Sequence, residues 1–387
     1  MTTHQTLIVG AGPFGLGLAA YLNRRGHDYC LVGKPLEFWE KHMPAGMLLR
    51  SNANWYLDPD HQWTIERFFA EQHPNHRASQ PIAREHYIEY MRWMMQQSGI
   101  PVLNHYVSHL AHQEPGFRAQ LDNGQTIQAR NVVLATGFQY FAHSPNYLTD
   151  KIPAGRYAHT CDAVRMEVYR NRRVLLIGGR QSAFESAALL REGGAAHVHL
   201  SYRHDTPAFA EADWSWVEKI VAHLATHPGW FGELPAAEQA DYRYRLWAEG
   251  RLKVEPWLKG RVTQPDVILH PRTELVSATL QPDGALRTTL TNGEVLVVDD
   301  ILLATGYQVD ITRLPFLSLS LLQMVRVEQG FPLLDLNFQS SLPGLYFNSL
   351  AAGHSFGPFF GFTVGVRTAA SLIGRALCET QQTHEPG

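Results

Sequence analysis

Apolar and polar residues alternate in blocks along the chain, and the first blocks predict a strand, a turn and a helix. Residues 6–9 form an apolar run typical of a buried strand, and an amphipathic helix follows. The glycines Gly10, Gly12 and Gly15 separate the two, and a second short strand is expected over 28–33. Glycines at a strand-to-helix turn inside a βαβ unit are typical of dinucleotide-binding proteins, the alternative being an ordinary tight turn.

Each glycine has a physical role in such a site. Gly10 allows the sharp turn, Gly12 lets the backbone approach a pyrophosphate, and Gly15 lets the helix and strand pack closely. The helix N-terminus then presents free N–H groups and partial positive charge to the phosphates. The residues predicted to hold the pyrophosphate are Gly10, Gly12, Pro13, Phe14 and Gly15.

The same order of patterns occurs a second time. After the first turn, a helix is predicted over 85–98 and alternating strands over 102–132, which end in "NVVLATGF". A second turn lies within 174–190, and a helical segment over 211–250 and alternating strands over 273–300 lead to "DDILLATGY". The chain therefore repeats one α/β architecture, although few residues match between the copies.

The second turn differs from the first at one position. It keeps Gly178 and the small Ala183, but Arg180 stands where a glycine is expected. In a permanently occupied site this side chain would block the phosphate, whereas over an exchanging dinucleotide a guanidinium can pair with the pyrophosphate. We predict that this turn holds NADP through Gly178, Arg180, Gln181 and Ser182; the alternative is an internal ion pair of Arg180 and lost nucleotide binding.

Composition narrows the class of protein. A chain of 387 residues exceeds one ordinary domain and predicts two or three, and 45% hydrophobic against 18% charged residues favours a filled globular core over disorder. A net charge of −3 without a basic run argues against a nucleic-acid partner. No apolar run is long enough to span a membrane, and "MTTHQT" lacks the features of a signal peptide.

The cysteines bear on compartment and redox chemistry. Cys30, Cys161 and Cys378 are far apart, without a C-x-x-C pair. Their spacing excludes a dithiol relay between sequence neighbours and fits a reducing, cytoplasmic location.

The two turns and their closing ATG motifs resemble the two-domain flavoproteins. That resemblance implies an α/β fold of two Rossmann-like, three-layer dinucleotide-binding domains, with the NADP domain inserted in the FAD domain. The FAD-binding domain is expected over 1–165 and 316–387, and the NADP-binding domain over 166–315 with a helical insertion at about 211–250. The tail is expected to return to the FAD domain and cover the flavin.

Within that group the chain looks most like the class B flavin-dependent monooxygenases, which include flavin-containing monooxygenases and ornithine/lysine N-hydroxylases. "LLATGY" matches the second ATG motif of the N-hydroxylases, and residues 43–69 are similar to their flavin-covering segment, with Arg50 at the lysine position. "GRYAHTCDA" overlaps the monooxygenase fingerprint and keeps Gly155 and His159. The resemblance implies FAD and NADPH as cofactors.

The resemblance also assigns residues. Arg50, Asn52 and His159 are the expected catalytic residues, with His159 between the two domains and a structural role as its alternative. Core packing is the alternative for Trp39 and Met47, and Gly33 replaces the usual ribose-binding acid, leaving the backbone or Glu37 for that task. The further expected cofactor contacts are Lys34, Trp39, Met47, Val107, Ala135, Thr136, Gly137, Ala304, Thr305, Gly306, Ser349 and Phe356.

The end of the second strand of the second unit indicates NADPH over NADH. A site for NADH usually ends this strand with an acid, but "HVHLSYR" has none. Ser201 and Arg203 suit a 2′-phosphate, the hydroxyl by donating a hydrogen bond and the guanidinium by pairing charge. The alternative is that Arg203 is a solvated surface residue.

The resemblance implies an NADPH- and O2-dependent monooxygenase that acts through a flavin C4a-(hydro)peroxide on a small molecule, most simply by N-hydroxylating an amine. Sulfoxidation or Baeyer–Villiger oxygenation by the same chemistry stays open, as do a flavoprotein NAD(P)H reductase without oxygen transfer and a nucleotide-binding protein without turnover. No nucleic-acid, membrane or metal partner is expected, because no His/Cys/Glu cluster has metal-ligand spacing in the sequence.

Overall fold

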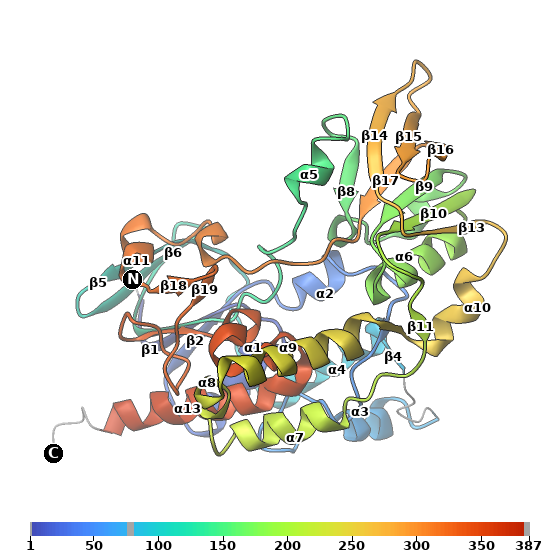
Figure 1. The fold of residues 1–387 in the computed structure, drawn as a ribbon. Coiled ribbons are helices and arrows are strands. Elements are labelled where there is room, and N and C mark those ends of the chain that lie inside the picture. The colour runs from blue at the N-terminus through green and yellow to red at the C-terminus, as the bar shows by residue number, and fades with distance from the viewer. Residues whose placement is uncertain (1, 76–80, 383–387) are drawn as a thin grey trace.

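The computed structural model describes residues 2–75 and 81–382 (Figure 1). Two sheets stand apart in space, and the chain crosses from the first to the second and back again. This is the predicted α/β fold of two Rossmann-like units, one inserted in the other, and the fold-class prediction is confirmed.

The first sheet has the strand order β2-β1-β7-β6-β5, with β20 beside β7. β1 pairs parallel with β2 on one side and, along nearly its whole length, with β7 on the other, and the first half of β7 also pairs antiparallel with β6. β20 returns from the tail and pairs parallel with β7, Leu345 opposite Val132 and Phe347 opposite Leu134, as predicted. The strands are β1 (Thr2–Val9), β2 (Tyr29–Val32), β5 (Val107–Gln113), β6 (Gly116–Leu121), β7 (Thr126–Leu134) and β20 (Leu345–Phe347).

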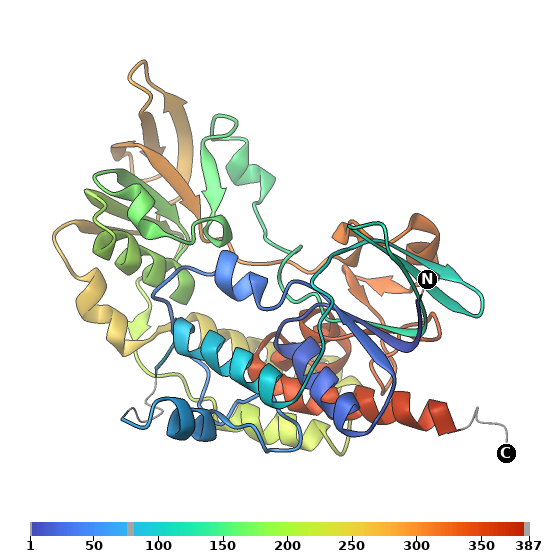
Figure 2. The same ribbon diagram turned by 180° about the vertical axis from the view of Figure 1, so that it is seen from behind.

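Helices cover this sheet in a layer with one large apolar core. Pro13 at the first position of α1 suits a helix start, and Gly17 lets α1 approach the tail helix α13, where an added Cβ would lie 2.6 Å from Val366. Figure 2 shows α1, α4 and α13 together in this layer. The elements are α1 (Pro13–Arg24), α2 (Glu37–Lys41), β3 (Leu48–Leu49), α3 (Ile65–Gln72), β4 (Ile82–Ala83), α4 (Arg84–Gln97) and α13 (Val366–Gln382).

The second sheet is parallel throughout, with the order β13-β10-β9-β17-β8. Its central strands β9 and β17 have the near-continuous apolar character of a sheet covered on both faces, by α6 on one and a three-stranded hairpin sheet on the other. The elements are α5 (Asn146–Thr149), β8 (Tyr157–His159), β9 (Arg173–Ile177), α6 (Gln181–Glu192), β10 (His197–Tyr202), α10 (Lys259–Val262), β13 (Val267–Pro271), β14 (Leu275–Leu280), β15 (Leu286–Leu290), β16 (Val295–Val298) and β17 (Asp300–Leu303).

The predicted domain boundaries stay a prediction, and two observations bear on the first of them. β8 precedes residue 166 but pairs with β17 in the second sheet. Leu148 and Ile152 are buried in the apolar cluster of that unit. Both favour a start of the second unit before residue 166.

The helical segment predicted at 211–250 leaves and re-enters the second unit through one short ladder, in which Ala208 pairs with Lys253 and Phe209 with Val254. The helices themselves pack on the first unit: Trp216 contacts Phe359, and Thr368 donates to the carbonyl of Val221 at 3.2 Å. The insertion thus closes one side of the space between the units (Figure 1). Its elements are β11 (Ala208–Phe209), α7 (Ser215–Leu224), α8 (Trp230–Glu233), α9 (Ala236–Arg251) and β12 (Lys253–Val254).

The chain returns to the first unit through α11 (Leu319–Met324), β18 (Val327–Glu328), β19 (Phe331–Pro332) and α12 (Gly353–Phe356). None of the helices in the described residues combines the length and the apolar composition needed to cross a membrane.

Candidate active site

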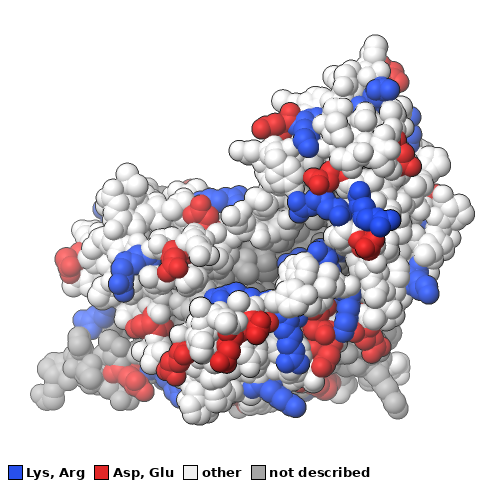
Figure 3. All heavy atoms as spheres, in the orientation of Figure 1, with Lys and Arg blue, Asp and Glu red and all other residues white. Residues whose placement is uncertain are grey.

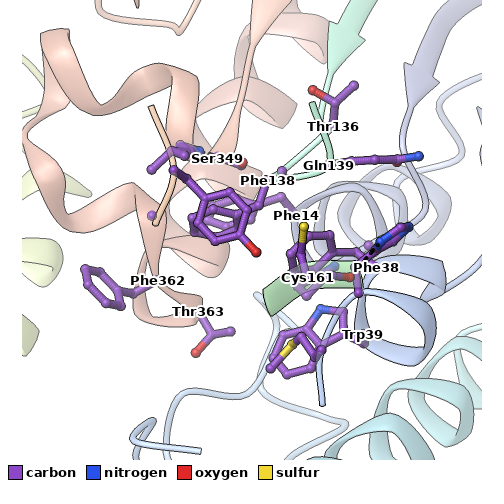
Figure 4. Close-up of a pocket in the computed structure, with 18 of the residues that line it drawn as sticks. Phe14, Phe38, Trp39, Thr136, Phe138, Gln139, Cys161, Ser349, Phe362 and Thr363 are labelled. Carbon is purple, nitrogen blue, oxygen red and sulfur yellow. Dashed lines mark hydrogen bonds between the residues drawn. The ribbon is translucent and has the colours of Figure 1, made fainter. Parts of the chain in front are cut away.

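A cavity of about 650 Å³ opens between the two units and the insertion, within the usual size of a ligand site (Figure 3). Figure 4 shows residues from distant parts of the chain meeting there: Phe14 and Trp39 from the first unit, Cys161 just after β8, and Phe362 and Thr363 from the tail. The predicted residues that line it are Gly10, Gly12, Pro13, Phe14, Lys34, Trp39, Met47, Arg50, Val107, Ala135, Thr136, Gly137, His159, Gln181, Ser182, Gly306 and Ser349.

The first glycine turn lies at one wall of this cavity. Gly10 has φ +115°, and an added Cβ would lie 2.4 Å from the carbonyl oxygen of Ala135; on Gly15 it would lie 1.9 Å from that of Gly10. A Cβ on Gly12 would meet nothing within 4 Å. Because no side chain in the described residues caps α1, its first N–H groups and this open space fit a pyrophosphate.

The end of β2 shows how the missing acid is replaced. Gly33 has φ +156°, and an added Cβ would lie 2.7 Å from the backbone nitrogen of Ala11, so a side chain there would press on the turn. Glu37 lines the cavity nearby, accepts a hydrogen bond from the Tyr106 hydroxyl and pairs with Lys41 at 3.0 Å. Tyr106 also lies under the ammonium of Lys34, at 4.5 Å. The ribose role of Glu37 stays a prediction, and a ribose would share this carboxylate with Tyr106 and Lys41.

The second turn keeps the backbone of the first. Gly178 has φ +148°, and an added Cβ would lie 2.5 Å from the carbonyl oxygen of Ala304. Arg180 donates to the carbonyl of Arg251 at 2.8 Å and lies 4.8 Å from the ring of Trp247, with no ion pair among the residues described. Burial, Arg251 and Arg203 lower the pKa of Arg180, so the guanidinium lies in a cationic neighbourhood suited to phosphate.

The predicted role of Ser201 is wrong. Its hydroxyl is fully buried and bonds to the Thr273 hydroxyl at 2.9 Å, which ties β10 to the end of β13 and leaves nothing for a phosphate. Arg203, two residues on, is exposed beyond the end of β10, and its role stays a prediction.

The segment over 43–69 is braced against the insertion. Arg50 lines the cavity, but its guanidinium pairs with Glu255 at 2.6 Å and donates to the carbonyl of Gly250 at 2.9 Å. Asn52 donates to Glu218 at 2.8 Å and does not line the cavity, contrary to the expected approach to the flavin. Both side chains hold this segment on α7 and the end of α9, which was not predicted.

The loops after the two ATG motifs meet at the junction of the units. Phe138 and Tyr307, each the next residue after its motif, have ring centroids 4.8 Å apart. His159 places Nε2 3.1 Å from the carbonyl oxygen of Gly306 and its ring against Tyr307, and burial lowers its pKa. Burial favours the neutral form of the neighbouring Cys161 as well and raises its pKa to about 12, so this thiol stays protonated.

Glu185 is a cavity residue that sequence reasoning missed. Its side chain is 1% exposed, and it accepts a hydrogen bond from the Leu48 backbone N–H at 2.7 Å, linking α6 of the second unit to the first. Burial raises its pKa to about 7. Its spacing of three residues from Ser182 is the sequence signal that puts Glu185 on the same side of α6. That spacing does not predict the contact with Leu48.

The remaining predicted residues do not line the cavity, some because they are buried behind its wall. Phe356 is 1% exposed and stacks on Phe338 in the core, contrary to its expected cofactor contact. Thr305 donates to the carbonyl of His143 and supports the second closing loop. The predicted residues that do not line the cavity are Gly15, Asn52, Gly178, Arg180, Ser201, Arg203, Ala304, Thr305 and Phe356.

One group of possible metal ligands forms outside the cavity. Atoms of His73, His86 and Glu89 lie within 4.8 Å of one another, and His73 Nε2 lies 3.0 Å from the Glu89 carboxylate. The sequence predicted no such cluster because His73 ends α3 while the other two lie on α4, and only folding brings them together. None of the three lines the cavity.

Comparison with known proteins agrees with this architecture. Residues 7–227, more than half of the chain, match the family model "Pyridine nucleotide-disulphide oxidoreductase". The chain belongs to this family. The prediction of an oxidoreductase is confirmed, although no described cysteine is paired in a disulfide.

The chain is also similar in sequence to individual curated proteins. It is 29% identical over 215 residues to an FAD-dependent urate hydroxylase of Xanthomonas campestris pv. campestris, a match to 52% of this chain and 45% of that protein. It is 25% identical over 337 residues to the indole-3-pyruvate monooxygenase YUCCA1 of Oryza sativa subsp. japonica, covering 78% and 76% of the two chains.

A solved ornithine N-hydroxylase from Kutzneria sp. 744 superposes with a TM-score of 0.81 at 18% identity, covering 98% of this chain and 100% of that one. The predicted resemblance to the flavin monooxygenases is thus confirmed. Because this chain covers less than half of the urate hydroxylase, its own activity and substrate are proposals.

Proposed function

We propose that this protein is an FAD- and NADPH-dependent monooxygenase that transfers one atom of O2 to a small molecule and releases the other as water. The observation that carries the proposal is that one cavity joins both nucleotide units: Gly12 of the first turn and Gln181 and Ser182 after the second line the same space. Hydride transfer between two dinucleotides needs their reactive rings in contact, and this arrangement supports such a contact.

The first turn and Glu37 would hold FAD, with α1 directed at its pyrophosphate and Glu37 at its ribose. Arg180 and Arg203 would hold the phosphates of NADPH from the second unit. Bound FAD supplies hydride acceptance and oxygen activation, and the chain supplies position and shelter.

Water exclusion falls to the aromatic wall of the cavity. Trp214 of the insertion and Phe362 of the tail both line it, with ring centroids 6.0 Å apart. By excluding water, this wall would favour oxygen transfer to the substrate over loss of oxygen as hydrogen peroxide. Arg50 acts in this scheme by positioning the covering segment, through its bonds to Glu255 and Gly250.

The finer proposal is hydroxylation of an amine nitrogen. It is supported by the overall likeness to the ornithine N-hydroxylase and by "LLATGY" in this chain. Sulfoxidation and Baeyer–Villiger oxygenation would use the same cavity. A disulfide reductase is disfavoured because Cys161, which lines the cavity, has no partner cysteine and a raised thiol pKa.

The test begins with the purified protein. A bound yellow flavin that NADPH bleaches without oxygen supports the cofactor assignment, and its absence contradicts it. Amines, sulfides and ketones are then screened for stimulated NADPH oxidation, with hydrogen peroxide measured to detect uncoupled turnover. Oxygenated product labelled from 18O2 supports a monooxygenase, whereas reduction of acceptors without label supports a reductase.

A further inference from the structure

Helix α9 turns one face to the cavity. Arg243, Leu246, Trp247, Gly250 and Arg251 line it, and their spacing of three and four residues places them along one side of the helix. Arg251 lies at the second turn, since Arg180 donates to its carbonyl. Arg243 lies two turns earlier, roughly 12 Å away along the helix axis, beside the tail.

Arg243 is a cation without an anion. Its guanidinium donates to two neutral acceptors, the Gln239 side chain at 3.2 Å and the His354 carbonyl at 3.4 Å, and lies over the Phe231 ring at 4.9 Å. Within the described part of the chain it forms no ion pair, whereas Arg50 in the same cavity pairs with Glu255. Burial alone lowers its pKa, because no carboxylate compensates.

The cavity offers no acid that could neutralise Arg243. Glu37 and Glu185 are the carboxylates among the described residues that line it. Glu37 accepts a hydrogen bond from Tyr106 and pairs with Lys41. Glu185, on α6, accepts a hydrogen bond from the Leu48 backbone N–H. Because its present partners are neutral, an anion that enters the cavity would add a charge-assisted bond that no described lining residue supplies.

Apolar surface lies next to this cation. Leu246 and Trp247 follow Arg243 on the same face of α9, and Phe362 faces the cavity from the tail. Trp247 is 41% and Phe362 38% exposed, unusual values for aromatic side chains in a cleft and a sign that a ligand can cover them.

We propose that Arg243 binds a carboxylate of the substrate and that Trp247 and Phe362 receive a flat apolar body, so that the substrate is an aromatic carboxylic acid. This inference rests on the proposed function for the identity of the site. The contact is binding only and involves no bond change.

Matched ligand pairs test the inference independently of turnover. Calorimetric titration of the purified holoenzyme uses benzoate, phenylacetate and 2-naphthoate, each beside its neutral amide. A guanidinium–carboxylate bond in a sheltered site predicts that at least one acid binds roughly 10- to 100-fold more tightly than its amide. No preference for any acid overturns the proposal.

Variants on one helix then locate the preference. Arg243→Gln should abolish it and Arg243→Lys should retain part of it. Arg245→Gln is the control, because Arg245 lies on α9 over Trp216, at 4.2 Å, and does not line the cavity. Equal loss in the Arg245 variant, or an unchanged preference in Arg243→Gln, overturns the assignment. Failure of the proposed function appears separately, as absent flavin or absent oxygen-dependent NADPH oxidation.

Discussion

Gly12 and Arg180 occupy the same place in the two halves of the molecule, immediately before α1 and α6. Their backbones nearly coincide, with φ −93° and ψ −171° at Gly12 and φ −113° and ψ −178° at Arg180. Any residue adopts this extended conformation. We therefore predict that the ligand requires glycine at position 12, whereas Gly10 and Gly178, with strongly positive φ, are requirements of the backbone.

The comparison continues one turn further along each helix. Gly17 of α1 lies against Val366 of the tail helix, and Glu185 of α6 holds the Leu48 N–H of the other unit. The first helix is thus built for close packing inside its own unit. The second carries a polar contact across the junction. The same supersecondary unit serves a fixed ligand in one half and an interface in the other.

The largest expected effect comes from making the first turn like the second. Gly12→Arg fills the open space before α1 without straining the backbone, so the protein should fold but be purified without flavin. Flavin absorbance per protein and a circular dichroism spectrum measure both parts. Gly12→Ala is the graded comparison: its Cβ meets no protein atom within 4 Å, so any flavin that it loses, less than Gly12→Arg loses, reflects contact with the ligand alone. Normal flavin content in Gly12→Arg would refute the ligand requirement.

The next effect concerns the polar contact of α6. The pKa of Glu185 is raised from 4.5 to about 7 in the folded state, so the folded protein binds more protons and loses stability as pH rises through this window. The loss should be on the order of 3 kcal/mol by about pH 8, and Glu185→Gln should remove it.

Urea unfolding of both proteins at about pH 5 and pH 8 measures the difference. Glu238→Gln, an exposed carboxylate in the first turn of α9, should leave the pH dependence unchanged. A parallel pH dependence in wild type and Glu185→Gln would contradict the buried, protonated carboxyl.

A third test makes the second turn like the first. Arg180→Gly removes a cation with no acidic partner in the described residues, so NADPH affinity should fall roughly 10- to 100-fold while flavin content stays normal. Stopped-flow reduction at varied NADPH measures the affinity. Unchanged or tighter binding would rule out the clamp.

A fourth test separates the two nicotinamide nucleotides. Arg203→Ala should weaken NADPH about 10-fold or more and hardly change NADH, which lacks the 2′-phosphate. Ser201→Ala should affect stability and leave this preference intact, since the hydroxyl is buried against Thr273. An equal loss of affinity for both nucleotides would contradict the assignment of Arg203 to the 2′-phosphate.

The smallest effect is expected at the junction. His159→Ala removes the ring that contacts Tyr307 and the Gly306 carbonyl. Flavin reduction or the ratio of product to NADPH should change about 2- to 5-fold, within 1 kcal/mol, while flavin content does not. Loss of flavin with normal NADPH kinetics would contradict a role between the units.

What the sequence predicted correctly was local. The glycines, the apolar pattern of α1 and the alternating strands before each ATG motif each act within a few residues of chain, and they predicted the repeated α/β units. The return of the tail was implied by the resemblance to the flavoproteins. The errors are contacts between distant segments. Asn52 reaches Glu218, Ser201 reaches Thr273, and Glu185 reaches Leu48 137 positions away, and none of these pairs leaves a local pattern.

The ladder between β11 and β12 has a consequence for how this protein can change. It brings the two ends of the helical insertion side by side, as Ala208 pairs with Lys253 and Phe209 with Val254. A segment whose ends meet can be lengthened, shortened or exchanged without moving the strands on either side. Because this segment carries Trp214, Arg243 and Trp247, replacing it would renew one wall of the cavity while both sheets keep their place, provided that the contacts of Arg180 with Trp247 and Arg251 are rebuilt.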